Sequence, residues 1–239
     1  MAMTKRTVTT GDLITRIRNL GEIRATYVTN SVLVQEINQS RLDLYEKLLD
    51  AGACDYFESS ANVNVVTNTA SYDLPDRYHT TLGVDVLLDG GDYATLDRYN
   101  FQDRNLYSNS VTTQNYGTYR EDTHYRVRGD FITFYPTPQW TQTNGIKHIY
   151  VAVPADLNTA STVETIDGFY GWEDYIVMDC LVKFIGGKEE GDAQQWMQER
   201  SKVESRIERM KRKRDRGGVD TIANLDREHR RYRRWGKSV

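Results

Sequence analysis

Few residues in this sequence have the type and spacing that metal or nucleotide chemistry requires. The four histidines lie far apart, and none belongs to an H-x-H or H-E-x-x-H pattern or to a Cys/His cluster at ligand spacing. No glycine-rich phosphate-binding motif occurs, and Gly186 and Gly187 end an expected helix instead of opening one. We therefore expect neither a metal ion nor a cofactor. The histidines are His79, His124, His148 and His229.

Two pairs of neighbouring carboxylates have the composition of an acid and base pair, because glycoside cleavage needs only two such groups. The first pair, Asp89 and Asp92, flanks two glycines, which indicates a turn. The second pair, Glu173 and Asp174, falls in the first turn of an expected helix, where the helix dipole favours anions. Because these structural roles explain both pairs better than catalysis, the sequence predicts a protein that is not an enzyme, and a wall-degrading or other hydrolase stays open only as the weakest alternative.

The two cysteines, Cys54 and Cys180, lie far apart, each at the edge of an apolar helical pattern. This placement favours two buried free thiols. A structural disulfide or a shared metal is the weaker alternative, and redox chemistry is not indicated.

The charge of the chain is divided by position. Of the 31 Lys and Arg, fifteen lie in residues 199–239 beside seven of the 34 Asp and Glu, which gives this segment a net charge of +8 and leaves −11 for the rest. The end of the chain has too little apolar surface to fold alone, but it offers guanidinium groups and aromatic anchors to a partner. We predict a docking arm whose binding residues are Arg227, Arg230, Arg231, Tyr232, Arg233, Arg234 and Trp235.

The same basic residues permit a second interpretation, in which the C-terminal helix and arm bind nucleic acid. The cluster from Arg209 to Arg216 is typical of a nucleic-acid patch, and Tyr232 and Trp235 could stack on bases. Against this, three glutamates in residues 199–208 are spaced to pair with basic residues on one helix, and the acidic remainder of the chain repels DNA. Protein docking is preferred, and nucleic-acid binding stays open as the alternative.

Both ends of the sequence predict helices. Apolar residues at helical spacing predict a short amphipathic helix over Asp12–Leu20, with Gly21 as its C′ residue. A second, longer helix is expected to begin after an N-cap of Thr29 or Ser31 and to end at Gly52.

Two further helices are expected near the other end of the chain. Residues 168–187 are apolar on nearly all sides and predict a buried central helix. Residues 189–214 predict an exposed helix that packs along a single seam, followed by the helix-stopping pair Gly217 and Gly218. The residues expected to pack one subunit against another are Trp172, Trp196, Val203, Ile207 and Met210.

The middle of the chain changes to a period of two and is rich in Asn, Thr, Tyr and Val, which predicts strands. One hairpin is expected over Thr81–Leu88 and Tyr93–Leu96, and a second over Tyr125–Arg128 and Phe131–Tyr135. The tripeptide beginning at Arg128 spells an integrin ligand, but here it predicts a hairpin turn. Other strands are expected at Val63 to Val65, Ala70–Leu74 and Lys147–Val153, with one or two helical turns in Asn100–Ser110.

These elements predict an α+β fold, in which a helical bundle built from N- and C-terminal helices contains an inserted antiparallel β region and ends in an extended arm. The segments expected are residues 1–55 and 168–214 for the bundle, 56–167 for the β region and 215–239 for the arm. No secretion signal or long apolar stretch is found, so we expect a cytoplasmic protein that does not contact a membrane.

The order of these parts resembles the tailed-bacteriophage head-to-tail connector proteins, also called adaptors. The similarity covers about Val28 to Arg214, and its strength lies in the series of elements and not in one motif. The matching features are the helix Glu36–Gly52 after Tyr27-Val-Thr, the segment Ala70–Pro75, the strand Leu82–Leu87, the strand Phe131–Pro136, and the helix that starts at Trp172 before a long charged helix.

The resemblance implies a non-enzymatic virion protein at the head-tail junction, made in the host cytoplasm, that forms a homo-oligomeric ring of about twelve copies beneath the portal. It implies the portal protein and the tail proteins, nozzle or tail-completion, as partners. The helical bundle would form the ring, the β part would face the tail and the C-terminal arm would reach the portal. Genomic double-stranded DNA would pass through the channel without specific binding, which an acidic wall favours by repelling phosphates.

Overall fold

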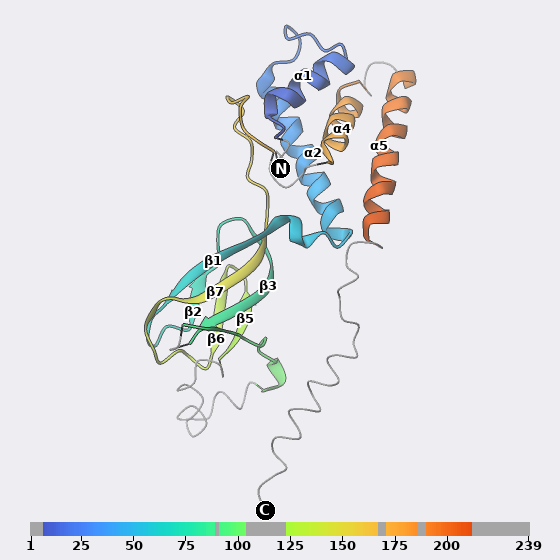
Figure 1. Cartoon of the computed structure of the whole chain (residues 1–239). Coiled ribbons are helices and arrows are strands. Elements are labelled where there is room, and N and C mark those ends of the chain that lie inside the picture. The colour runs from blue at the N-terminus through green and yellow to red at the C-terminus, as the bar shows by residue number, and fades with distance from the viewer. Residues whose placement is uncertain (1–6, 89–90, 104–122, 167–170, 186–189, 212–239) are drawn as a thin grey trace, which may run out of the picture. The chain divides into compact units, whose positions relative to one another are not determined.

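The computed structural model describes residues 7–88, 91–103, 123–166, 171–185 and 190–211 (Figure 1). Their contacts divide the chain into two compact units. The helical unit takes its described residues from 12–53 and from 171 onward, and the β unit takes them from 7–11 and from 54–166. Helices from both ends of the sequence with strands inserted between them confirm the predicted α+β class.

Helix α2 (Asn30–Asp50) has the start and the end that the sequence predicted. Thr29 is its N-cap, because the Thr29 hydroxyl accepts a hydrogen bond from a first-turn N–H. At the other end Gly52 has a φ of +77°, and the N–H of the next residue donates to the carbonyl of Leu48, which is a Schellman motif. The apolar stripe that α2 buries consists of Leu33, Val34, Ile37, Leu44 and Leu48.

Helix α1 (Thr10–Leu20) ends by the same motif, but with a different residue in the left-handed position. The residue with positive φ is Glu22, at +48°, and the N–H that follows it donates to the carbonyl of Arg18 at 3.1 Å. The prediction of Gly21 as the C′ residue is therefore wrong by one position. Gly21 instead lies where α1 packs tightly, since a Cβ there would come within 2.7 Å of Cδ2 of Leu181.

Helix α4 (Glu173–Ile185) contacts both α2 and α5 (Glu190–Lys211), which confirms the predicted buried central helix. Its buried side chains are Glu173, Tyr175, Ile176, Val177, Asp179, Cys180 and Leu181. Helix α5 instead buries a single seam containing Val203 and Ile207 and exposes most of its other described side chains. This exposure explains why α5 is charged nearly all round whereas α4 is apolar.

The β unit contains an antiparallel sheet with the strand order β1-β7-β3-β4. Its strands are β1 (Glu58–Val65), β7 (Gln142–Ala152), β3 (Tyr78–Leu87) and β4 (Tyr93–Thr95). Strands β3 and β4 form the first predicted hairpin, in which Leu87 lies opposite Tyr93. Strand β7 begins earlier than predicted, because its polar first residues are held by β1 and not by burial: Gln142 pairs with Val65.

A second antiparallel sheet has the order β2-β6-β5. Its strands are β2 (Ser71–Asp73), β6 (Phe131–Tyr135) and β5 (His124–Arg128). The predicted hairpin of β5 and β6 turns at Gly129, whose φ is +58°, so the integrin-like tripeptide is a hairpin turn. In the region expected to form helical turns, Phe101–Asp103 is a short 3-10 helix, and residues 104–110 lie outside the described residues.

The two sheets enclose one apolar core, so the β unit is a two-layer sandwich. Val84, Val86 and Ile146 enter this core from the first sheet, and Ile132 and Phe134 enter it from the second. The first described residues of the chain also belong to this unit, because Thr9 forms a β-bridge with Thr165.

Candidate functional site

A buried carboxylate on α4 gathers polar side chains from α2, α4 and α5. The Asp179 side chain is 2% exposed, and its Oδ1 accepts a hydrogen bond from Arg200 at 2.7 Å. Its Oδ2 accepts from the Ser40 hydroxyl at 2.6 Å and lies 2.9 Å from Nζ of Lys183. These four residues, which we call the Asp179 network, fix the register of the three helices that contact one another.

The network changes the protonation behaviour of its members. Burial alone would raise the pKa of Asp179, but hydrogen bonds from Ser40, Lys183 and Arg200 outweigh burial and hold the pKa below its ordinary value of 3.8. Burial raises the pKa of the neighbouring Cys180 thiol to about 12. Asp179 is therefore a structural anion, and Cys180 is a neutral thiol without nucleophilic character.

A second set of contacts continues the Asp179 network toward the surface. Lys47 on α2 forms an ion pair with Glu204 on α5, with 3.1 Å between Nζ and Oε1, and Nζ lies 5.9 Å from the centroid of the Tyr175 ring. Glu204 also lies 3.6 Å from Nε of Arg200. Ion pairs and hydrogen bonds therefore connect α2, α4 and α5 from the buried Asp179 to the surface of the helical unit, and they hold the three helices in fixed positions.

The loop that joins α1 to α2 is fixed by one arginine. Nη1 of Arg18 donates to the carbonyl of Ile23 at 3.2 Å, and Nη2 donates to the carbonyl of Val28 and to Oδ1 of Asn30, both at 2.8 Å. A guanidinium donates from separate nitrogens held in one plane, so it fixes acceptors in several directions, whereas an ammonium group donates from a single atom that rotates freely. The loop is therefore held in one conformation before any partner binds.

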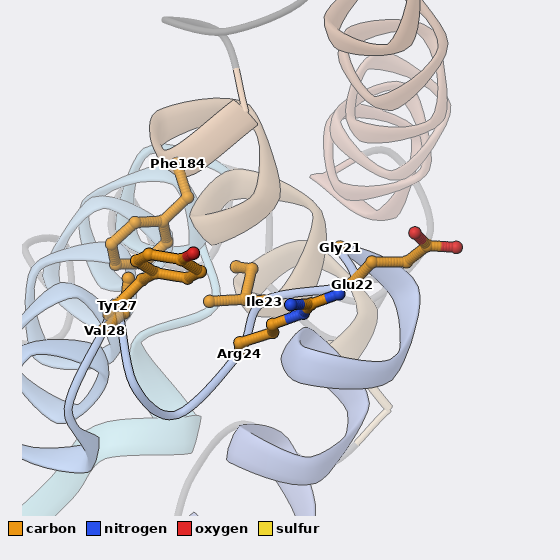
Figure 2. A pocket seen from close by; sticks show the side chains of 7 residues that line it. All are labelled: Gly21, Glu22, Ile23, Arg24, Tyr27, Val28 and Phe184. Atoms are coloured by element: carbon orange, nitrogen blue, oxygen red, sulfur yellow. The ribbon is translucent and has the colours of Figure 1, made fainter.

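Beside this loop the helical unit has a pocket of about 290 Å³, which we call the loop pocket. Figure 2 shows the side chains of Ile23, Val28, Tyr27 and Phe184 gathered on one side, while the carboxylate of Glu22 points away from them. Tyr27 is 77% exposed. A largely exposed tyrosine on a preorganised loop, beside a pocket with both apolar and charged side chains, is typical of an anchor in a protein interface. The pocket is lined by Gly21, Glu22, Ile23, Arg24, Tyr27, Val28 and Phe184.

Exposed apolar residues flank the loop on both sides in the sequence. Leu20 at the end of α1 is 43% exposed, and Val32 in the first turn of α2 is 41% exposed. Single exposed apolar residues need no explanation, but these two bracket the loop that carries Tyr27. We call Leu20, Tyr27, Val32 and the loop pocket together the loop surface.

The residues predicted to pack between subunits have different surroundings. Trp172, Val203 and Ile207 are buried in the helical unit, where Arg206 lies 5.4 Å from the centroid of the Trp172 ring. Trp196 is half-buried, and the side chain of Met210 is outside the described part of the chain. Because three of the five support the core of their own subunit, their role between subunits stays a prediction.

The predicted arm and its seven binding residues, Arg227 to Trp235, lie outside the described residues, as do Gly217 and Gly218. In the described part of α5, Glu199 and Lys202 form the ion pair that their spacing predicted. Arg209 is exposed, and its Nε donates to the carbonyl of Ser205 at 2.9 Å. The first half of the basic helix is therefore a solvated face with ion pairs, as the sequence indicated.

Of the carboxylates that could act as an acid and base pair, Asp89 lies outside the described residues, whereas Glu173 and Asp174 have structural partners. Asp174 pairs with Arg16 at 2.6 Å, and the buried Glu173 accepts a hydrogen bond from the N–H of Gly171 at 2.9 Å, so both stabilise the start of α4.

Burial lowers the pKa of His148 to about 4, and its Nε2 lies 2.9 Å from the Thr81 hydroxyl. This histidine is a neutral core residue at physiological pH.

The two cysteines are free thiols; Cys180 is buried as predicted, whereas Cys54 is half-exposed. Within the described ranges no group of three or more His, Cys, Asp or Glu is placed to hold a metal ion. No helix in those ranges is long and apolar enough to cross a bilayer.

Sequence reasoning did not find three residues on which this site depends: Arg18, Tyr27 and Asp179. Asp179 had a signal, because it is a carboxylate in the apolar middle of the helix with a lysine four residues later. Arg18 and Tyr27 had none, since their roles arise from the path of a loop that propensity does not specify.

The chain was compared with known proteins. The sequence model of the SU10 adaptor protein family matches residues 8–224, which includes the described residues of both units except the first. A search of curated proteins finds no match.

Proposed function

The chain belongs to the SU10 adaptor protein family, a family of bacteriophage adaptors, and from this premise we propose that it is a non-enzymatic virion protein joining the portal to the tail at the head-tail junction. The observation that carries the proposal is the match over residues 8–224, which spans the helical unit and the β unit together. The partners proposed are the portal protein on one side and tail proteins, nozzle or tail-completion, on the other.

In this proposal about twelve copies form a closed ring through their helical units. A ring requires two different patches on each copy, because the contact between neighbours is head-to-tail. One patch is the loop surface around Tyr27, which is exposed and held by Arg18. The other is the outer face of α5, where Met197 is 47% exposed and Trp196 is half-buried. The Asp179 network keeps the two patches at a fixed distance within each copy.

The C-terminal arm docks on the portal in this proposal, through its arginines and through Tyr232 and Trp235. What supports it is composition: Arg and aromatic residues dominate the energetic centres of protein interfaces. The acidic remainder of the chain lines the channel through which genomic DNA leaves, since net negative charge lets a duplex pass without being held.

Native mass spectrometry and electron microscopy of the Tyr27→Ala variant test the ring. We expect the unmodified chain to form closed rings, alone or with purified portal, and the variant to remain a monomer under the same conditions. The variant should unfold at the same denaturant concentration as the parent, because a side chain that is 77% exposed contributes little to the core.

Tyr93→Ala is the matched control, because Tyr93 is also largely exposed, at 48%, but lies on the β unit. It should assemble like the parent. Rings of normal size from Tyr27→Ala would contradict the use of the loop surface, and the absence of rings from the unmodified chain with its portal would contradict the adaptor ring itself.

A further inference from the structure

We propose that a second pocket, on the β unit, binds an acidic side chain of a partner protein. This pocket has a volume of about 200 Å³ and combines two guanidinium groups with three tyrosine rings. The proposal rests on the proposed function only for the identity of the partner, which would be a tail protein. We call the site the Arg-Tyr pocket; it is lined by Tyr78, Arg98, Tyr99, Tyr125, Arg126 and Val127.

The topology of the sandwich brings these residues together from three segments. Tyr78 begins β3, and Tyr125 and Arg126 lie on β5 of the other sheet. The chain after β4 closes the site, because Arg98 forms a parallel bridge with Tyr125 and the N–H of Tyr99 donates to the Tyr125 carbonyl at 2.8 Å. The pocket therefore spans the junction of two sheets, where side chains from both can reach one ligand.

Both guanidinium groups retain donors for a ligand. Nε of Arg98 reaches the Tyr125 hydroxyl at 3.4 Å and its Nη2 reaches the Thr81 carbonyl at 3.5 Å, which are weak hydrogen bonds at the limit of useful length. Arg126 lies 5.5 Å from the centroid of the Phe101 ring. Within the described residues neither arginine forms an ion pair with a carboxylate, although ion pairs are common elsewhere on this chain.

The aromatic walls are held in place before a ligand arrives. Tyr99 stacks on Tyr135 with 4.3 Å between ring centroids, and Tyr125 is buried to 5% exposure. The Tyr78 hydroxyl lies 3.0 Å from the Thr81 hydroxyl, which fixes the direction of its ring. Because these side chains are already ordered, less conformational entropy is lost on binding. The two arginines can therefore select an anion strongly over a neutral group.

The charge around the pocket indicates which anion enters it. The described residues of the β unit contain eleven Asp or Glu and five Lys or Arg, and two of those five basic residues, both arginines, line the pocket. A surface with this acidic excess repels a long polyanion such as duplex DNA. A carboxylate on a single side chain avoids that repulsion, because it needs favourable charge only inside a small concavity, and it matches the guanidinium fork.

Fluorescence anisotropy of a labelled hexaglutamate peptide added to the full chain tests the proposal. We expect saturable binding that weakens as salt is raised, and no binding of the matched hexaglutamine peptide. Arg98→Gln and Arg126→Gln should each weaken binding by about tenfold or more, which is the scale of one charge-assisted hydrogen bond. Arg128→Gln removes the same charge from the same strand outside the lining of the pocket and should leave binding within about twofold.

If the Gln variants do not fold, the unmodified chain decides the question through its tyrosine ring resonances, which should shift for Tyr99 and Tyr125 on addition of hexaglutamate. Equal binding of the glutamine peptide, equal weakening by Arg128→Gln, or unshifted tyrosine resonances would overturn the proposal. Displacement of the peptide from the pocket by duplex DNA would overturn it in favour of nucleic acid. Ring assembly is measured separately, so a chain whose hexaglutamate binding depends on Arg98 and Arg126 but which forms no rings with its portal refutes the adaptor ring and leaves this pocket standing.

Discussion

At the scale of single residues, Asp179 explains how a helix as apolar as α4 can carry a buried charge. A carboxylate that is 2% exposed is stable there because three donors surround it, from Ser40, Lys183 and Arg200. The two cationic partners remain about one-third exposed, so water offsets part of their desolvation cost. The main role of such a network is to specify which faces of the helices pack together, and its contribution to the free energy of unfolding is modest.

The Asp179→Asn variant should therefore be less stable, by about 2 kcal/mol at neutral pH, because it leaves Lys183 and Arg200 without their shared anion. The pKa of Asp179 is lower in the folded chain than in the unfolded chain. Its stabilisation is therefore present above the unfolded pKa of about 4 and is lost as the pH falls through the folded value. Urea unfolding at about pH 7 and about pH 3 should show the difference between variant and parent shrinking in acid.

Asp43→Asn is the matched control, because Asp43 also contacts Nζ of Lys183, at 3.2 Å, but its side chain is 36% exposed whereas that of Asp179 is 2% exposed. An ion pair that is this accessible to water is worth at most about 1 kcal/mol, so the control should lose less than half as much stability. A loss from Asp179→Asn that is equally large at both pH values would show that packing, and not the ionised carboxylate, is responsible.

At the scale of elements, α1 and α2 end in the same motif with different sequence solutions. In α2 the left-handed position holds Gly52, whereas in α1 it holds Glu22, and the neighbouring Gly21 allows close packing against Leu181.

We predict that Gly21→Ala destabilises the chain by about 1–2 kcal/mol, because the added Cβ would lie 2.7 Å from Leu181 and 3.2 Å from the Ile17 carbonyl. Helix propensity alone predicts the opposite sign, since alanine is the better helix former. Thermal unfolding measures the difference.

Two companion variants separate packing from conformation. Glu22→Gly should stabilise the chain by up to about 1 kcal/mol, because glycine adopts the positive φ of this position without strain. In a Leu181→Ala background the cost of Gly21→Ala should fall, since the clashing side chain is gone. An unchanged cost in that background would assign the effect to the backbone.

The spacing of apolar residues predicted most of these elements, because a helix or strand that is buried on one face has apolar residues at regular intervals in its sequence. The hairpins and the α2 caps were predictable from turn chemistry at Thr29, Gly52 and Gly129. The first half of β7 was not, since Gln142 and its polar neighbours are ordered by a partner strand and carry no apolar alternation. Pockets escaped prediction for a related reason: Arg98 and Tyr125 meet only after two sheets pack.

At the scale of the whole molecule, the main feature is the opposition of an acidic body and a basic end. Residues 220–239 contain six Lys or Arg and three Asp or Glu, so removing them changes the net charge of the chain from −3 to −6. A protein that binds the duplex through this segment must overcome repulsion from the rest of the chain. A protein that docks there on a portal uses directional guanidinium and aromatic contacts, which do not require a positive total charge.

Deletion of Asp220–Val239 separates these two functions in one experiment. We expect the shortened chain to keep the circular dichroism of the parent and to lose binding to purified portal, as measured by co-sedimentation. The parent should show no binding of a duplex at about 0.15 M salt, because the repulsion of DNA by the acidic body exceeds the attraction of the six basic residues in 220–239. Replacing Arg230, Arg231, Arg233 and Arg234 by Lys keeps the charge but removes the planar guanidinium groups, so it should weaken portal binding and leave the chain without affinity for DNA. Portal binding that survives the deletion at normal affinity would refute the docking arm. A steep salt dependence of DNA binding that disappears with the arm would establish the nucleic-acid alternative in its place, because counterion release then accounts for the affinity.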